Sequence, residues 1–253
     1  MKKIFVMAAA LNVAAALFAA EKPTFNVLDF GAKGDGATKN TVAIQKALDA
    51  CAVAGGGTVT FPEGVYLTGS LLIGPKTTLQ MAQRANLLGS PDIADYPVVN
   101  VRWEGEFREG HRSLLSATNA ANITISGGAI FGPPLPLGKL RNPRGPLLIE
   151  LTSCTNVLLE NFTTQYQQLW SIHPLFCKNF TARGLTIRTV NANGDGIDVD
   201  SCSDVLIEKC DINTGDDAIS LKSGRGLAAQ NLNRPTENVV IRDCRLQSSI
   251  FAG

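Results

Sequence analysis

The sequence is poor in histidine and carries almost no net charge. Among 253 residues only His111 and His173 are histidines, and 23 Lys and Arg face 22 Asp and Glu. Two histidines provide little material for a zinc cluster or a histidine-dependent triad. The balanced charge gives no basic field, which argues against nucleic acid as the main partner. We therefore expect neither a zinc cluster nor a nucleic-acid partner, and we assign no cofactor.

Long apolar runs are absent except at the start of the chain. Lys2 and Lys3 precede an apolar run over residues 4–20, interrupted only by Asn12, and a charged residue, Glu21, follows it. This pattern predicts a cleavable signal peptide over residues 1–20, with a membrane anchor as the alternative. The remaining residues, 21–253, are enough for one domain with a sizeable core. We expect a secreted or periplasmic protein with no membrane contact after signal removal, monomeric at full length.

A short phrase recurs along the chain: a polar turn residue and then a few β-branched or aliphatic residues. The phrase begins at spacings of 34, 23, 25 and 34 residues, at Asn122, Asn156, Asn179, Asp204 and Asn238. Repeats of this length indicate a solenoid, and apolar runs this short, broken by Gly, Asn and Pro, favour strands over helical repeats. The fold class we predict is all-β, a right-handed parallel β-helix with stacked aliphatic ladders in its core.

The segment after the signal predicts a cap for this solenoid. A strand is expected from Phe25, a turn over residues 32–39, and a helix that starts with Asn40 as N-cap and runs through Cys51 to the glycines at 55–57. Such a helix would close the N-terminal end of the β-helix and cover exposed sheet edges.

The cysteines follow the same repeat. Cys154, Cys177 and Cys202 each lie two residues before a phrase, and no Cys-x-x-Cys pair is present. A structural zinc site is therefore not expected. Buried free thiols in a ladder and disulfides between neighbouring coils both fit this spacing.

Two acidic motifs carry the strongest functional signal. Residues 193–198 read Asn-Gly-Asp-Gly-Ile-Asp and residues 215–222 read Gly-Asp-Asp-Ala-Ile-Ser-Leu-Lys, offset by 22 residues. In neighbouring parallel strands this offset stacks Asp195 on Asp217, with Asp216 to one side. We expect three converging carboxylates, and crowding of like charges should raise the pKa of at least one of them.

These motifs, with Arg-Trp-Glu-Gly from residue 102 and Trp-Ser-Ile-His-Pro from residue 170, resemble the polygalacturonases, glycoside hydrolase family 28. The resemblance spans roughly residue 25 to the chain end. It implies a β-helix that hydrolyses pectic polysaccharide with inversion and without a metal. It further implies that Asp216 is the general acid and that Asp195 and Asp217 hold and deprotonate the attacking water.

Four other residues are candidates for substrate binding. Arg102 and Trp103 are expected to line the sugar groove, because Arg pairs with carboxylates and an aromatic ring stacks on a pyranose; ordinary loop packing is the alternative. His173 is expected either to contact substrate or to be a hydrogen-bonded turn residue. Lys222 is the fourth candidate, and the alternative is that it forms an ion pair with Asp200 on the neighbouring strand. Asp198 and Asp200 are expected to point outward from their strand.

The sequence departs from the family near residue 250. The family has Gly-His-Gly-Gly and later Arg-Ile-Lys there, whereas here Phe251 takes the histidine position and Arg-Ile-Lys is absent. This predicts a C-terminally truncated sequence or a short form without activity. Two other functions stay open: a pectate lyase, which would need carboxylates arranged for Ca²⁺, and a noncatalytic glycan-binding β-helix.

Overall fold

The repeated phrase forms parallel strands that stack side by side along one sheet. The computed structural model describes residues 22–134, 142–167 and 169–250, so the predicted signal peptide and Phe251 lie outside the described residues. The first sheet contains, in spatial order, β1 (Thr24–Asn26), β3 (Gly57–Phe61), β6 (Thr77–Met81), β11 (Ala121–Ser126), β14 (Thr155–Glu160), β17 (Lys178–Arg183), β20 (Ser203–Glu208) and β23 (Glu237–Arg242).

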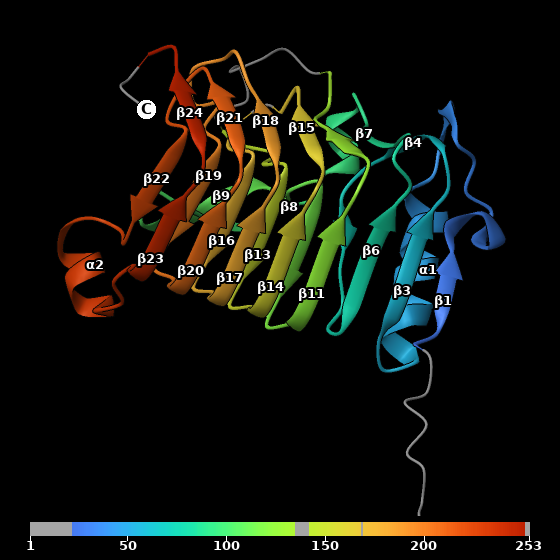
Figure 1. The fold of residues 1–253 in the computed structure, drawn as a ribbon, viewed down its shortest axis with the longest axis horizontal. Coiled ribbons are helices and arrows are strands. Elements are labelled where there is room, and N and C mark those ends of the chain that lie inside the picture. The colour runs from blue at the N-terminus through green and yellow to red at the C-terminus, as the bar shows by residue number, and fades with distance from the viewer. Residues whose placement is uncertain (1–21, 135–141, 168, 251–253) are drawn as a thin grey trace, which may run out of the picture.

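Two further parallel sheets complete each coil. The second sheet contains β5 (Leu71–Leu72), β10 (Leu115–Thr118), β13 (Ile149–Thr152), β16 (Ile172–Leu175), β19 (Ile197–Asp200) and β22 (Ile219–Lys222). The third sheet contains β2 (Asp35–Lys39), β4 (Gly64–Thr68), β7 (Ala85–Gly89), β12 (Ala129–Phe131), β15 (Thr163–Gln165), β18 (Thr186–Arg188), β21 (Asp211–Thr214) and β24 (Arg245–Ser248). Figure 1 shows these coils succeeding one another from blue to red. The predicted right-handed parallel β-helix is confirmed.

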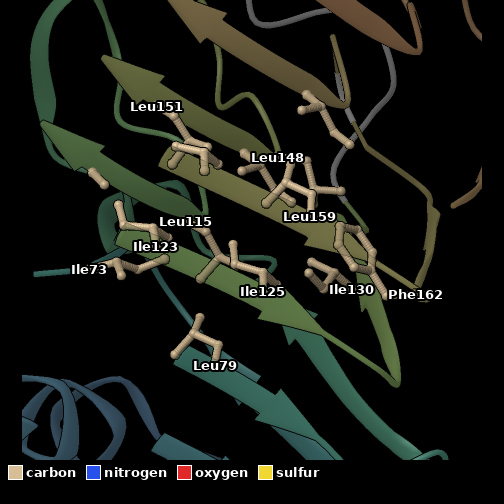
Figure 2. Packing of buried hydrophobic residues seen from close by; sticks show 14 of the residues in the cluster. Ile73, Leu79, Leu115, Ile123, Ile125, Ile130, Leu148, Leu151, Leu159 and Phe162 are labelled. Carbon is tan, nitrogen blue, oxygen red and sulfur yellow. The ribbon is translucent and has the colours of Figure 1, made fainter. Parts of the chain in front are cut away.

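Alternate residues of each strand enter the core. Ile123 of β11 stacks on Val157 and Ile125 on Leu159 in the next coil, and all four are buried. Figure 2 shows such side chains pointing into the space between the sheets. Burial of one aliphatic side chain contributes about 1.5 to 3 kcal/mol, so stacked ladders of this kind supply the main stabilisation.

The polar residue that opens each phrase has a backbone role. Asn156, Asn179 and their three counterparts all adopt left-handed φ angles of 54° to 60°. Their side chains also join neighbouring coils: the Asn179 amide donates to Asn156 Oδ1 at 2.8 Å, and the Asn156 amide to Asn122 Oδ1 at 3.0 Å. Asn and Asp tolerate this conformation better than other non-glycine residues, which explains why they recur.

The predicted capping helix is present as α1 (Thr41–Val53), at the N-terminal end of the solenoid (Figure 1). Its buried residues, Ile44, Ala47, Leu48 and Cys51, join the core. Asn40 is the N-cap residue, as predicted, but its side chain makes no capping hydrogen bond. Its Oδ1 accepts from Lys33 N at 2.7 Å, so the side chain instead closes the preceding loop.

The segment before the helix differs from the prediction in two ways. The first strand, β1, ends at Asn26 and a 3-10 helix follows over Val27–Phe30. The predicted turn over residues 32–39 contains strand β2, which pairs with β4 and starts the third sheet. Pairing with a neighbouring strand overrides the weak strand preference of this Gly-containing segment.

One antiparallel hairpin interrupts the solenoid. It consists of β8 (Val98–Trp103) and β9 (Glu106–His111), joined by Glu104 and Gly105. Both turn residues have positive φ, 47° and 91°, as a two-residue type I′ turn requires. A Cβ at Gly105 would lie 2.6 Å from the Cα of Gly224, so the hairpin tip packs directly against the segment after β22.

The six cysteines are free thiols, and all but Cys244 are buried. Cys154, Cys177 and Cys202 occupy equivalent places in successive coils, and Cys177 N lies 3.2 Å from the Sγ of Cys202. The first of the two expectations, a ladder of buried thiols, describes this structure.

None of the helices in the described part of the chain is long and apolar enough to cross a membrane.

Candidate active site

The two acidic motifs lie in neighbouring coils, in the expected register. In β19 and β22, Ile197 pairs with Ile219 and Val199 with Leu221. Just before these strands, Gly196 N donates to Asp217 O at 2.9 Å. A Cβ at Gly196 would come within 2.3 Å of Ala218 O, so only glycine allows this close approach. Leu221 is 54% exposed because β22 is the outermost strand of its sheet.

The predicted convergence of three acids is present. One carboxylate oxygen from each of Asp195, Asp216 and Asp217 lies within 4.8 Å of the other two. Asp195 and Asp217 lie at equivalent positions before neighbouring strands, and Asp216 immediately precedes Asp217, so the register of the two coils brings the three carboxylates to one place.

Asp216 is oriented by backbone donors. Its Oδ2 accepts from Asn193 N at 2.8 Å and its Oδ1 from Asp217 N at 3.0 Å. The Thr214 hydroxyl donates to the carbonyl of Asp216 at 2.7 Å. These bonds join the two acidic motifs and fix the direction in which the carboxylate points.

Asp195 has a different environment. It is 4% exposed, and its Oδ1 has no hydrogen-bond partner among the described residues. Burial, followed by the charges of Asp198 and Asp216, raises the pKa of Asp195 to about 9. One raised pKa was expected from crowding, but burial is the larger cause.

Two of the other predicted site residues, Arg102 and Trp103, end strand β8 of the hairpin. Arg102 is 3% exposed, and its Nε donates to Asp200 Oδ2 at 3.0 Å. Trp103 is also buried and stacks on Trp170 with ring centroids 4.1 Å apart. Neither side chain presents an open face to solvent, which matches the loop-packing alternative.

His173 is fully buried beside other charged groups. Its Nδ1 lies 3.5 Å from Glu150 Oε1 and its Nε2 4.0 Å from Asp200 Oδ2. Although burial opposes this, Asp200 and Glu150 raise the pKa of His173 to about 9. The imidazole is therefore protonated at neutral pH and acts as an internal counter-ion.

The expected ion pair between Lys222 and Asp200 is wrong. Lys222 Nζ lies 2.9 Å from Asp198 Oδ1, while Asp200 pairs with Arg102. Asp198 and Asp200 point out of the β-helix, as the strand alternation predicted, with Ile197 and Val199 in the core. Both acids are nevertheless at most 1% exposed, and Arg102 of the hairpin pairs with Asp200.

The sequence interpretation missed the hairpin and the buried charges Glu150, Asp198 and Asp200. One signal was available: Glu104 and Gly105 separate two strand-like runs by two residues, which is typical of a β-hairpin. Nothing local to the acidic motifs indicated where that hairpin would pack.

Comparison with known proteins agrees with this geometry. The family model described as rhamnogalacturonase A/epimerase, pectate lyase-like, matches residues 24–248. The chain belongs to this family. The resemblance to the polygalacturonases noted from the sequence motifs is confirmed as well.

A probable polygalacturonase of Vitis vinifera is 34% identical over 86% of this chain and 48% of its own length. An exo-poly-alpha-D-galacturonosidase of Dickeya chrysanthemi is 29% identical over 84% of this chain and 44% of its own length.

Solved structures of this family share the fold. An exopolygalacturonase from Thermotoga maritima superimposes with a TM-score of 0.81 at 29% identity, covering 88% of this chain and 61% of that one. A family 28 exopolygalacturonase from Yersinia enterocolitica gives 0.80 at 28% identity, covering 89% and 49%. The chain spans about half the length of the curated relatives it matches.

Proposed function

We propose that this chain hydrolyses glycosidic bonds of polygalacturonan or a related pectic polysaccharide by general acid and base catalysis. The observation that carries the proposal is the convergence of Asp195, Asp216 and Asp217 within 4.8 Å in a chain of the polygalacturonase type. All three acids come from one chain, which supports a monomer as the catalytic unit. The run of small apolar residues after Lys2 and Lys3 supports export to the periplasm or beyond.

In this proposal Asp216 donates a proton to the glycosidic oxygen. Asp195 and Asp217 hold a water molecule on the opposite face of the sugar, and Asp217 accepts its proton as the water attacks the anomeric carbon. The products are a free reducing end of inverted configuration and a new non-reducing end. Stereochemistry tests this assignment directly, because inverting and retaining glycosidases use two carboxyl groups at different separations and release opposite anomers.

The hairpin favours cleavage at a chain end. Its tip places Trp103 against Trp170, and the Lys222 ammonium lies 4.6 Å from the Trp170 ring centre, so a wall stands next to the strands that carry the acids. Leu147 and Leu169 complete this wall. A wall there would stop a long polymer from passing through. The Thermotoga and Yersinia structures are named exopolygalacturonases, which supports the same interpretation.

The test is incubation of the purified chain with polygalacturonate. New reducing ends without unsaturated products, unaffected by chelator, would support hydrolysis. Unsaturated products that require a divalent cation would show a lyase, and binding without turnover would show a glycan-binding protein. Proton NMR of the first anomer released would distinguish inversion from retention.

A further inference from the structure

Lys222 was expected to bind substrate, yet its ammonium group is held by a buried carboxylate. Its Nζ lies 2.9 Å from Oδ1 of Asp198, which is completely buried. The ammonium also lies 4.6 Å from the centre of the Trp170 ring, and only 20% of the side chain is exposed. A contact this enclosed leaves the ammonium little freedom to follow a ligand.

Asp198 follows Asp195 by three residues on the same chain segment. The charged groups that face Asp195 come from three places. They are Asp198 on β19, Asp216 and Asp217 before β22, and Lys222 on β22. His173 on β16 faces Asp198 from the preceding coil. Lys222 is the one cation among the groups that act on Asp195, and the other three are acids.

The effects of these charges have opposite signs. Burial raises the pKa of Asp198 to about 6, against the attraction of Lys222 and His173. The charge of Asp198 raises the pKa of Asp195, and the charge of Lys222 lowers it. Burial lowers the pKa of Lys222, but Asp198 and Asp195 together raise it above the usual value, so it stays charged.

We propose that Lys222 and the buried Asp198 form a positioning pair whose two opposite charges act on Asp195, and that Lys222 is not a substrate ligand. The catalytic meaning of this inference rests on the proposed function, since Asp195 is one of the two acids assigned to the attacking water. The pair itself is a property of the folded chain and is testable without turnover.

The direct test is titration of the Asp side-chain carboxyl carbons by NMR in the whole chain labelled with ¹³C-aspartate. The Asp195 signal is assigned by its loss in Asp195→Asn. Lys222→Met should raise the pKa of Asp195 by about one unit or more, and Asp198→Asn should lower it by a similar amount. Lys222→Arg keeps the charge and should change it much less. Arg225→Met, which removes an exposed cation paired with Glu104, should leave it unchanged.

Lys222→Met leaves the buried Asp198 without its nearest cation and is the variant most at risk of not folding. The double variant Lys222→Met with Asp198→Asn removes both charges, and the Asp195 pKa should return toward the wild-type value. An Asp195 pKa that stays constant through this series would overturn the proposal.

Activity gives a second, separate measurement. If the chain hydrolyses polygalacturonate, the pH dependence of kcat should move up with Lys222→Met and down with Asp198→Asn, while KM changes little. A rise in KM for Lys222→Met with an unshifted pH profile would restore Lys222 as a substrate ligand. If no variant and no wild type turns over substrate, the proposed function fails, and the NMR titration still decides on the pair.

Discussion

Arg102 and Asp200 form a buried ion pair between residues 98 positions apart in the chain, with 3.0 Å between Nε and Oδ2. Arg102 lies on β8 of the hairpin and Asp200 at the end of β19. Burial alone would raise the pKa of Asp200. His173, Ser201 and Arg102 together lower it below its usual value. The pair therefore ties the hairpin to a coil that carries a predicted catalytic acid.

Loss of the Arg102 charge should destabilise the whole chain. Arg102→Leu leaves Asp200 buried without its closest cation, so the free energy of unfolding should fall by about 3 to 5 kcal/mol. Urea unfolding at neutral pH measures this. The matched control is Arg225→Gln, whose ion pair with Glu104 at the hairpin tip is exposed and should contribute less than about 1 kcal/mol. Equal losses in the two variants would contradict the importance of burial.

The raised pKa of Asp195 predicts that this residue costs stability at neutral pH. The unfolded carboxyl ionises near 3.8, whereas the folded one keeps its proton up to about 9, so this group's contribution to stability falls as pH rises through that range. Asp195→Asn should therefore be more stable than wild type by roughly 1 to 4 kcal/mol at pH 7, with little difference below pH 4. The measurement is the difference between the two unfolding free energies at each pH.

His173 adds to the same pH dependence and must be separated from it. Its folded pKa is about 9, above the usual 6.5, so its stabilising contribution is complete below 6.5 and is lost as pH rises to 9. Because Asp195→Asn retains His173, the difference from wild type isolates Asp195. A difference that shrinks with rising pH would show that Asp195 is ionised in the folded chain.

Asp216→Asn tests the general acid. The variant keeps the side-chain volume but cannot donate the proton, so turnover of polygalacturonate should fall by about 10² to 10⁴ while binding of the glycan survives. Asp195→Asn and Asp217→Asn should each be severe too, and combining them should cost much less than the product of the singles, since both hold one water. Near-normal turnover by Asp216→Asn would reject its role.

The wall formed by Trp103 predicts the pattern of products. In Trp103→Ala the stack on Trp170 is lost, so the cleft should open and products of intermediate length should appear beside the terminal product. Chromatography of the early products measures this. Phe107→Ala, on the same hairpin but 54% exposed, should keep the wild-type pattern. Mixed products from the wild type itself would show that the wall does not block the polymer.

The sequence by itself determined the β-helix and the convergence of the three acids. Both depend on a one-dimensional repeat, because strands that stack coil on coil bring residues together when their spacing equals one coil. The offset of 22 residues therefore placed Asp195 over Asp217, and the repeated Asn and Asp positions marked the left-handed residues.

Only the tertiary structure decided which charges are buried and how they pair. The hairpin at Val98–His111 is an insertion outside the repeat, so no offset along the chain predicts where it packs. Its Arg102 pairs with Asp200 and its Trp103 stacks on Trp170, contacts between residues far apart in the chain. Burial and pairing fix the protonation of acids, and both are properties of the assembled surface, which the order of residues does not reveal.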